Sequence, residues 1–134
     1  MHYILALIAA ALSFHAAANP AANPGVKTLD QGVTVQITKP SNGVKPAANA
    51  TVTVHYRGTL KDGTEFDSSY KRNQPATFPL GNLVPCWKIA IPEIPVGASA
   101  KIVCPSATAY GPNAVGPIPP NSTLFFDLEV IATK

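Results

Sequence analysis

Apolar and polar residues alternate in short stretches over most of the chain after residue 32, which is the pattern of half-buried β-strands. Val33, Val35 and Ile37, for example, are separated by single polar residues. The strands expected from this pattern lie at residues 33–38, 51–58, 78–81, 100–104 and 123–132. Residues 60–66 predict a hairpin, because the Asp62-Gly63 pair suits a turn with positive φ angles.

One short helix is expected near residues 86–91, and Pro92 should end it. The strands are joined by turns and not by regular helical crossovers, which favours an antiparallel sheet. The pattern therefore predicts an α+β fold with five or six strands, in which the helix covers one face of the sheet. Neither an internal repeat nor a second domain is visible in the sequence.

The N-terminal stretch differs from the rest, because its first 25 residues contain no charged side chain. The apolar run at residues 4–12 is too short to span a bilayer, which needs about 20 residues. Its length suits the core of a signal peptide, and Ala16-x-Ala18 offers a cleavage site. The alternative is an amphipathic or core helix, since the stretch before the run has no Lys or Arg.

These features predict three segments along the chain. Residues 1–18 are expected to be a signal peptide, residues 19–32 a flexible leader rich in Ala, Asn, Pro and Gly, and residues 33–134 the folded domain. The mature protein would be periplasmic or secreted, without stable membrane association after cleavage.

Composition narrows the function classes further. Hydrophobic residues make up 46% of the 134 residues and charged residues only 13%, which indicates a packed domain and not a disordered chain. The net charge is +3, but the basic residues are scattered and form no stripe, so nucleic acid is not an expected partner.

Two cysteines, Cys86 and Cys104, remain to be explained. An even pair in an exported protein is typical of a disulfide. The alternative is two buried free thiols that act as small apolar groups. A metal site is not expected, because two thiols without a nearby His make a poor ligand set.

The inventory of catalytic groups is thin, whereas the aromatic residues are numerous. His55 is expected to be a surface histidine on a strand, and no nucleophile stands at a recognisable spacing from a base. Five aromatic residues come from five separate segments and could either fill the core or gather in a concave pocket. They are Tyr56, Phe66, Trp87, Tyr110 and Phe126. The nearby loop at residues 109–121 is long enough to be either functional or disordered.

Four motifs resemble the FKBP-type peptidyl-prolyl cis-trans isomerases, especially the exported bacterial members. They are VTVHYRGTLKDGTEFDSS, FPLGNLVPCW, AYG and IPPNSTLFFDLEV, and the resemblance covers roughly residues 33–133. It implies a twisted, mainly antiparallel sheet wrapped around one short helix. It also implies rotation about X–Pro bonds without cofactor or metal, with proline-containing polypeptides as clients and macrolide inhibitors as a further ligand class. The alternative is a binding or chaperone module of the same fold with little isomerase activity.

The resemblance assigns roles to individual residues. The catalytic group would be Asp67, Tyr110 and Trp87, and the substrate-binding group Tyr56, Phe66, Val84, Ile118 and Phe126. Asp67 would position the tyrosine that corresponds to Tyr56 and would not act as a general base. The loop at residues 109–121 would be an ordered flap, with Ile118 at the edge of the pocket.

The resemblance also bears on the cysteines and on assembly. Exported members often carry cysteines at the positions of Cys86 and Cys104, which favours the disulfide. Ala76 replaces a bulky aromatic and Pro117 an aliphatic residue, and both changes bear on affinity for macrolides. Some exported relatives carry a long helical dimerisation segment before this domain, where this chain has only residues 19–32, so a monomer is expected.

Overall fold

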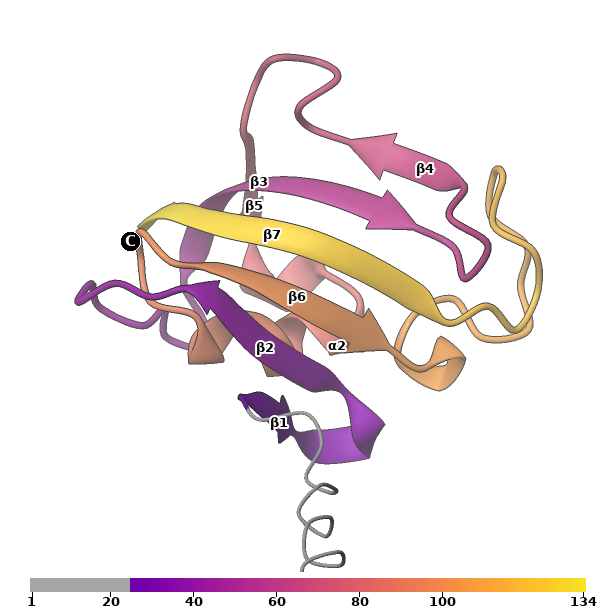
Figure 1. Cartoon of the computed structure of the whole chain (residues 1–134), viewed down its shortest axis with the longest axis horizontal. Coiled ribbons are helices and arrows are strands. Elements are labelled where there is room, and N and C mark those ends of the chain that lie inside the picture. Colours follow the sequence, from indigo (N-terminus) through magenta and orange to yellow (C-terminus); the bar gives the residue numbers. More distant parts are fainter. Residues whose placement is uncertain (1–24) are drawn as a thin grey trace, which may run out of the picture.

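The computed structural model describes residues 25–134; the expected signal peptide at residues 1–18 lies outside them. Within the described residues, seven strands form one antiparallel sheet (Figure 1). The strands are β1 (Val26–Thr28), β2 (Thr34–Lys39), β3 (Thr51–Thr59), β4 (Glu65–Ser68), β5 (Ala76–Pro79), β6 (Ser99–Cys104) and β7 (Leu124–Thr133). Their order across the sheet is β1-β2-β6-β7-β3-β4, and β5 pairs with the first half of β3.

A short helix, α2 (Pro85–Ala90), packs against the inner face of this sheet (Figure 1). Pro85 occupies the first helical turn, where a missing N–H costs nothing. The α-helix ends at Ala90 and continues as a single 3-10 turn, η3 (Ile91–Glu93), which contains Pro92. The short helix is therefore confirmed, but Pro92 lies inside the 3-10 turn that follows it and does not mark its end. Further 3-10 turns are η1 (Asp30–Gly32), η2 (Leu80–Asn82) and η4 (Ser106–Thr108).

The alternating pattern of the two longest strands separates the inner from the outer face of the sheet. The inward residues of β3 and β7 are buried and form the core with α2. They are Val52, Val54, Tyr56, Leu124, Phe126, Leu128 and Val130. The predicted α+β class and the antiparallel sheet around one short helix are confirmed.

The strand count is larger than predicted, because β1 lies within the expected flexible leader. Val26–Thr28 pairs with β2, and Lys27 Nζ lies 2.9 Å from Glu93 Oε1. Leu29 packs against the core, and its N–H donates to the carbonyl of Val33 at 2.7 Å. The expectation of a leader without structure is thus wrong for residues 25–32, which these contacts hold against the sheet.

Cys86 and Cys104 form a disulfide across 18 residues, and both are fully buried. Of the two alternatives that the sequence left open, the disulfide is the one observed. It joins the first turn of α2 to the end of β6. The helix that carries the disulfide is therefore tied to the strand that leads into the loop at residues 109–121.

We call residues 109–121 the flap. Its backbone is hydrogen-bonded to itself and to its base: Asn121 N–H donates to Gly111 O at 2.7 Å, and Val115 forms a bridge with Ile118. Gly111 and Gly116 have φ angles of +55° and +52°, which the tight path requires. Of the helices in residues 25–134, none has the length and apolar character needed to cross a membrane.

Candidate functional site

A pocket of about 370 Å³ opens between the inner face of the sheet, α2 and the flap. Its walls are largely aromatic and aliphatic, and one carboxylate lies among them. The lining residues are Tyr56, Phe66, Asp67, Phe78, Asn82, Leu83, Val84, Trp87, Tyr110, Leu124 and Phe126. An apolar cavity with a few converging polar groups is the usual form of a small binding site.

Trp87 forms the floor of this pocket. Its ring meets the rings of Tyr56 and Phe126 edge-on, with centroids 5.1 Å apart in both pairs. Phe78 approaches the indole from β5 at 5.9 Å, and Phe66 contacts Phe126 at 5.6 Å. These edge-to-face pairs are the arrangement that aromatic quadrupoles favour, so the rings hold one another in place.

Gly58 allows two of these rings to approach β3 closely. It lies opposite Asp67 on β4 and opposite Phe126 on β7. A Cβ atom at this position would lie 2.5 Å from the ring of Phe66 and 2.8 Å from that of Phe126. Only a glycine at this position therefore lets the rings of Phe66 and Phe126 lie this close to β3.

A three-residue network holds the carboxylate at the rim. The Tyr56 hydroxyl donates to Asp67 Oδ2, and Arg72 Nη1 donates to Asp67 Oδ1 at 2.7 Å. Arg72 Nη2 also donates to the Tyr56 hydroxyl at 3.1 Å. The Ser68 N–H completes the set by donating to Asp67 Oδ1 at 2.9 Å. The carboxylate is thus fixed in place while 41% of its side chain stays exposed.

The same contacts set the protonation states in the network. Burial raises the pKa of Asp67, but the hydrogen bonds from Tyr56 and Arg72 outweigh it and hold this pKa below its ordinary value. Burial, together with the bond to Asp67, raises the pKa of Tyr56. At neutral pH the network therefore contains an ionised carboxylate, a neutral phenol and a guanidinium. Asp67 has little basicity, which suits a positioning role better than proton abstraction.

Besides the buried indole N–H of Trp87, two further donors line the pocket without partners in residues 25–134. The N–H of Val84, the residue before α2, donates no hydrogen bond there. The hydroxyl of Tyr110, a residue that is 38% exposed at the start of the flap, likewise makes no side-chain hydrogen bond in that part of the chain. Both groups are free to bind a carbonyl oxygen of a ligand.

The structure brings together seven of the eight site residues expected from the sequence, and it places Ile118 elsewhere. Ile118 is 5% exposed and packs in the core, where it anchors the flap, and it is not among the lining residues. The pairing of Asp67 with Arg72 and the lining residues Phe78, Asn82, Leu83 and Leu124 were not predicted. The alternation in β5 could have indicated Phe78, whereas Asn82 and Leu83 follow an irregular turn.

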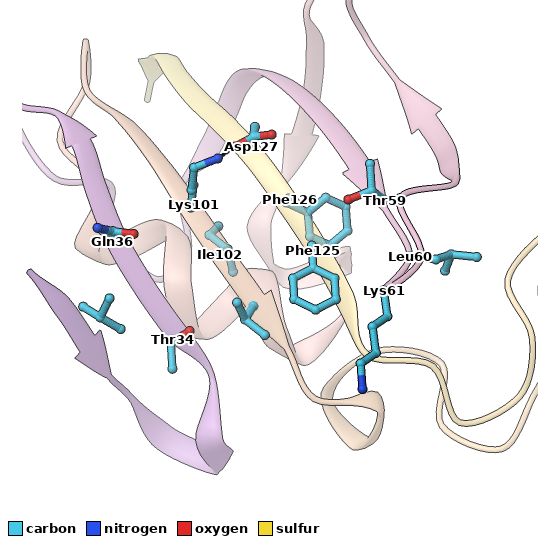
Figure 2. Close-up of a pocket in the computed structure, with 13 residues that line it drawn as sticks. Thr34, Gln36, Thr59, Leu60, Lys61, Lys101, Ile102, Phe125, Phe126 and Asp127 are labelled. Atoms are coloured by element: carbon cyan, nitrogen blue, oxygen red, sulfur yellow. Dashed lines mark hydrogen bonds and ion pairs between the residues drawn. The ribbon is translucent and has the colours of Figure 1, made fainter. Parts of the chain in front are cut away.

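A second hollow, of about 620 Å³, lies on the outer face of the sheet (Figure 2). Phe125 of β7 and Val103 of β6 lie opposite each other there, and the Lys101–Asp127 ion pair of 2.8 Å crosses the same two strands. The hollow is larger than the inner pocket but lacks its enclosing aromatic rings and its held carboxylate. Phe125 lines only the outer hollow, whereas its neighbour Phe126 borders both hollows and packs its ring against Trp87 and Phe66 of the inner pocket.

Comparison with known proteins agrees with this geometry. A family model described as FKBP-type peptidyl-prolyl cis-trans isomerase matches residues 42–131. The chain is 47% identical over 110 residues to the FKBP-type peptidyl-prolyl cis-trans isomerase FkpA of Aeromonas hydrophila, which covers 82% of the chain and 41% of the relative. It is 43% identical over 112 residues to the outer membrane protein MIP of Legionella longbeachae, covering 83% and 48%. The chain thus spans less than half the length of these two relatives.

Solved structures show the same fold. A crystal structure of a peptidyl-prolyl cis-trans isomerase from Pseudomonas syringae superposes with a TM-score of 0.78 and 40% identity, covering 84% of each chain. The crystal structure of FkpA from Escherichia coli gives a TM-score of 0.80 and 43% identity, covering 85% of this chain and 54% of the other.

Proposed function

The chain belongs to the FKBP-type peptidyl-prolyl cis-trans isomerase family, and on this premise we propose that it catalyses rotation about X–Pro bonds in folding proteins. The observation that carries the proposal is the inner pocket, in which a tryptophan floor, aromatic walls and a fixed carboxylate meet beside two free donors. The relatives from Aeromonas hydrophila and Pseudomonas syringae, both named peptidyl-prolyl cis-trans isomerases, support the same activity.

The reaction requires no general acid or base, because no covalent bond is made or broken. The barrier to rotation, about 18–20 kcal/mol, arises from the partial double-bond character of the amide. Twisting the bond removes conjugation and reduces charge separation, so an apolar pocket disfavours the polar planar amide more than the twisted one. Binding the twisted state better than the planar state is what lowers the barrier.

We assign roles according to position in the pocket. The proline ring would lie on Trp87, between Phe66 and Phe126, with Tyr56 as the remaining wall. The Val84 N–H would bind a carbonyl of the peptide, and the Tyr110 hydroxyl a second one. Asp67 would keep Tyr56 oriented and polarise the rim.

We further propose that the protein acts in the cell envelope on proline-containing segments of exported proteins. The apolar run at residues 4–12 and the disulfide support export. The name of the Legionella relative, an outer membrane protein, is in agreement. A monomeric state and binding of macrolide inhibitors remain predictions from the sequence.

The alternative is a binding or chaperone module with little isomerase activity. The open aromatic pocket and the free donors at its edge do not favour it, because simple docking requires neither a tryptophan floor nor a held carboxylate.

A protease-coupled assay on an X–Pro peptide tests the proposal. The wild type should accelerate cis-to-trans conversion, and Trp87→Leu and Asp67→Ala should each lower kcat/KM by about tenfold or more, because each removes part of the pocket. Tyr110→Ala should raise KM more than it lowers kcat if its hydroxyl only binds the peptide. A wild-type protein that leaves the peptide at the uncatalysed rate would contradict the enzyme and favour the binding module.

A further inference from the structure

Ser69 is a fully buried polar residue just outside the pocket, at the point where the chain leaves β4. The residues that follow turn back on themselves and return Arg72 to Asp67, two residues before Ser69. We call residues 69–74 the return turn. None of the roles proposed above involves Ser69.

The side chain of Ser69 takes the place of its own carbonyl in the ladder between β3 and the chain after β4. The Ser69 N–H donates to Tyr56 O at 2.9 Å, as in a regular antiparallel pair. In return, the Tyr56 N–H donates to Ser69 Oγ at 2.8 Å and not to Ser69 O. His55 Nδ1 also lies 2.8 Å from this hydroxyl, and its ring stacks on Tyr70 at 4.5 Å. The hydroxyl is therefore held on several sides.

Because the hydroxyl and not the carbonyl of Ser69 accepts the Tyr56 N–H, the Ser69 carbonyl is free to bind the return turn. It accepts the N–H of Arg72 at 3.1 Å and that of Gln74 at 3.3 Å. Asn73, inside the turn, has a φ angle of +52°, in the left-handed region that Asn adopts more readily than most other non-glycine residues. Ser69 thus accepts the Tyr56 N–H with its hydroxyl and the Arg72 N–H with its carbonyl.

We propose that Ser69 is a positioning residue for the Tyr56–Asp67–Arg72 network of the pocket. Tyr56 and Arg72 are the two side chains that bind the Asp67 carboxylate, and Ser69 holds the backbone of both. Without the hydroxyl, the buried Tyr56 N–H either loses its partner or recruits the Ser69 carbonyl, and the carbonyl then no longer holds the return turn. The first outcome loosens the backbone of Tyr56 and the second that of Arg72, so either one weakens the network that holds Asp67.

Only the effect of Ser69 on catalysis rests on the proposed function. The main measurement therefore follows the protonation of Asp67 and does not require isomerase activity. NMR titration of the Asp67 carboxyl carbon should show that Ser69→Ala raises the Asp67 pKa towards its ordinary value, because Tyr56 or Arg72 no longer lowers it as strongly. Ser69→Thr, which keeps the hydroxyl, should restore the wild-type titration. Ser41→Ala is the control, since the Ser41 hydroxyl donates to Val96 O at 2.6 Å, outside the network, and this variant should titrate as wild type.

The catalytic readout is kcat/KM for an X–Pro peptide. Ser69→Ala should lower it by about tenfold. The Ser69→Ala/Arg72→Met double variant should lose less than the sum of the two single losses, because both changes act on the same network. If the alanine variant does not fold, Ser69→Cys takes its place, because a thiol is a much weaker hydrogen-bonding group in a similar volume.

The outcomes separate the two proposals. An Asp67 titration that is unchanged in a folded Ser69 variant would overturn the positioning role, and so would strictly additive losses in the double variant. A wild-type protein without isomerase activity would contradict the proposed function, while the titration would still decide the role of Ser69.

Discussion

Asp67 shows at the scale of single residues how the pocket keeps a charge beside an apolar site. Burial favours its neutral form, and the donors Tyr56 and Arg72 reverse that preference. The arrangement resembles an orienting clamp more than an acid–base catalyst. The Asp67 carboxylate accepts hydrogen bonds on both oxygens and is thereby fixed at the rim of the pocket. It keeps the Tyr56 ring against Trp87, where a proline would bind.

The lowered pKa of Asp67 predicts how stability depends on pH. A carboxyl whose pKa is lower in the folded than in the unfolded state adds stability above the unfolded value, and this is lost as pH falls through the folded pKa. The free energy of unfolding of the wild type should therefore exceed that of Asp67→Asn at pH 6, and the difference should shrink as pH approaches 3. Urea unfolding at both pH values measures it. A difference that does not vary with pH would show that the charge of Asp67 is not what the network stabilises.

Single residues also mark what the sequence could and could not predict. Tyr56 and Phe126 were found because they lie within specific motifs and on alternating strand faces, and Trp87 because it lies within the motif FPLGNLVPCW. The pairing of Arg72 with Asp67 depends on a turn whose path is set by Ser69, and no local pattern reveals it. Ile118 was expected at the pocket edge, but a large apolar side chain gains more from complete burial in the core.

At the scale of elements, the disulfide links the parts that form the pocket. It ties the first turn of α2, one residue before Trp87, to the end of β6, which leads into the flap. A helix of six residues has little stability of its own, so it depends on such tertiary contacts. The disulfide thus secures the floor of the pocket relative to the base of the flap.

Reduction of this disulfide should destabilise the protein. A closed loop of this size contributes roughly 3 kcal/mol on the chain-entropy estimate. The free energy of urea unfolding should fall by about that amount when reductant is present throughout the unfolding equilibrium. The Cys86→Ala/Cys104→Ala variant is the control, because its unfolding should not respond to reductant. An oxidised and a reduced wild type of equal stability would contradict a stabilising role for the bond.

The elements differ in how well the sequence predicted them. Long alternation located β3 and β7, and the Asp62-Gly63 turn is present, with Gly63 at a φ angle of +91°. Strand β1 was missed because its three residues are all exposed and carry no burial pattern. It exists because it pairs with β2 and because Leu29 beside it packs against the core, and these are tertiary contacts.

At the scale of the whole molecule, a wrapped sheet with one covered face creates two different surfaces. The inner face and α2 enclose the aromatic pocket, whereas the outer face carries a larger hollow that is lined in part by the Lys101–Asp127 ion pair (Figure 2). The fold could be predicted because alternation and the family motifs agree along most of the chain. Which cavity is suited to proline follows from enclosure and ring geometry, and these appear only in three dimensions.

The neighbouring phenylalanines of β7 provide the most direct test that the inner pocket catalyses rotation. The measurement is NMR exchange between the cis and trans forms of an X–Pro peptide at equilibrium, without a coupling protease. The wild type and Phe125→Leu should shorten exchange from the uncatalysed scale of tens to hundreds of seconds, and Phe126→Leu should lose about tenfold or more of that acceleration. Equal losses in the two variants, or exchange at the uncatalysed rate with the wild type, would contradict the account.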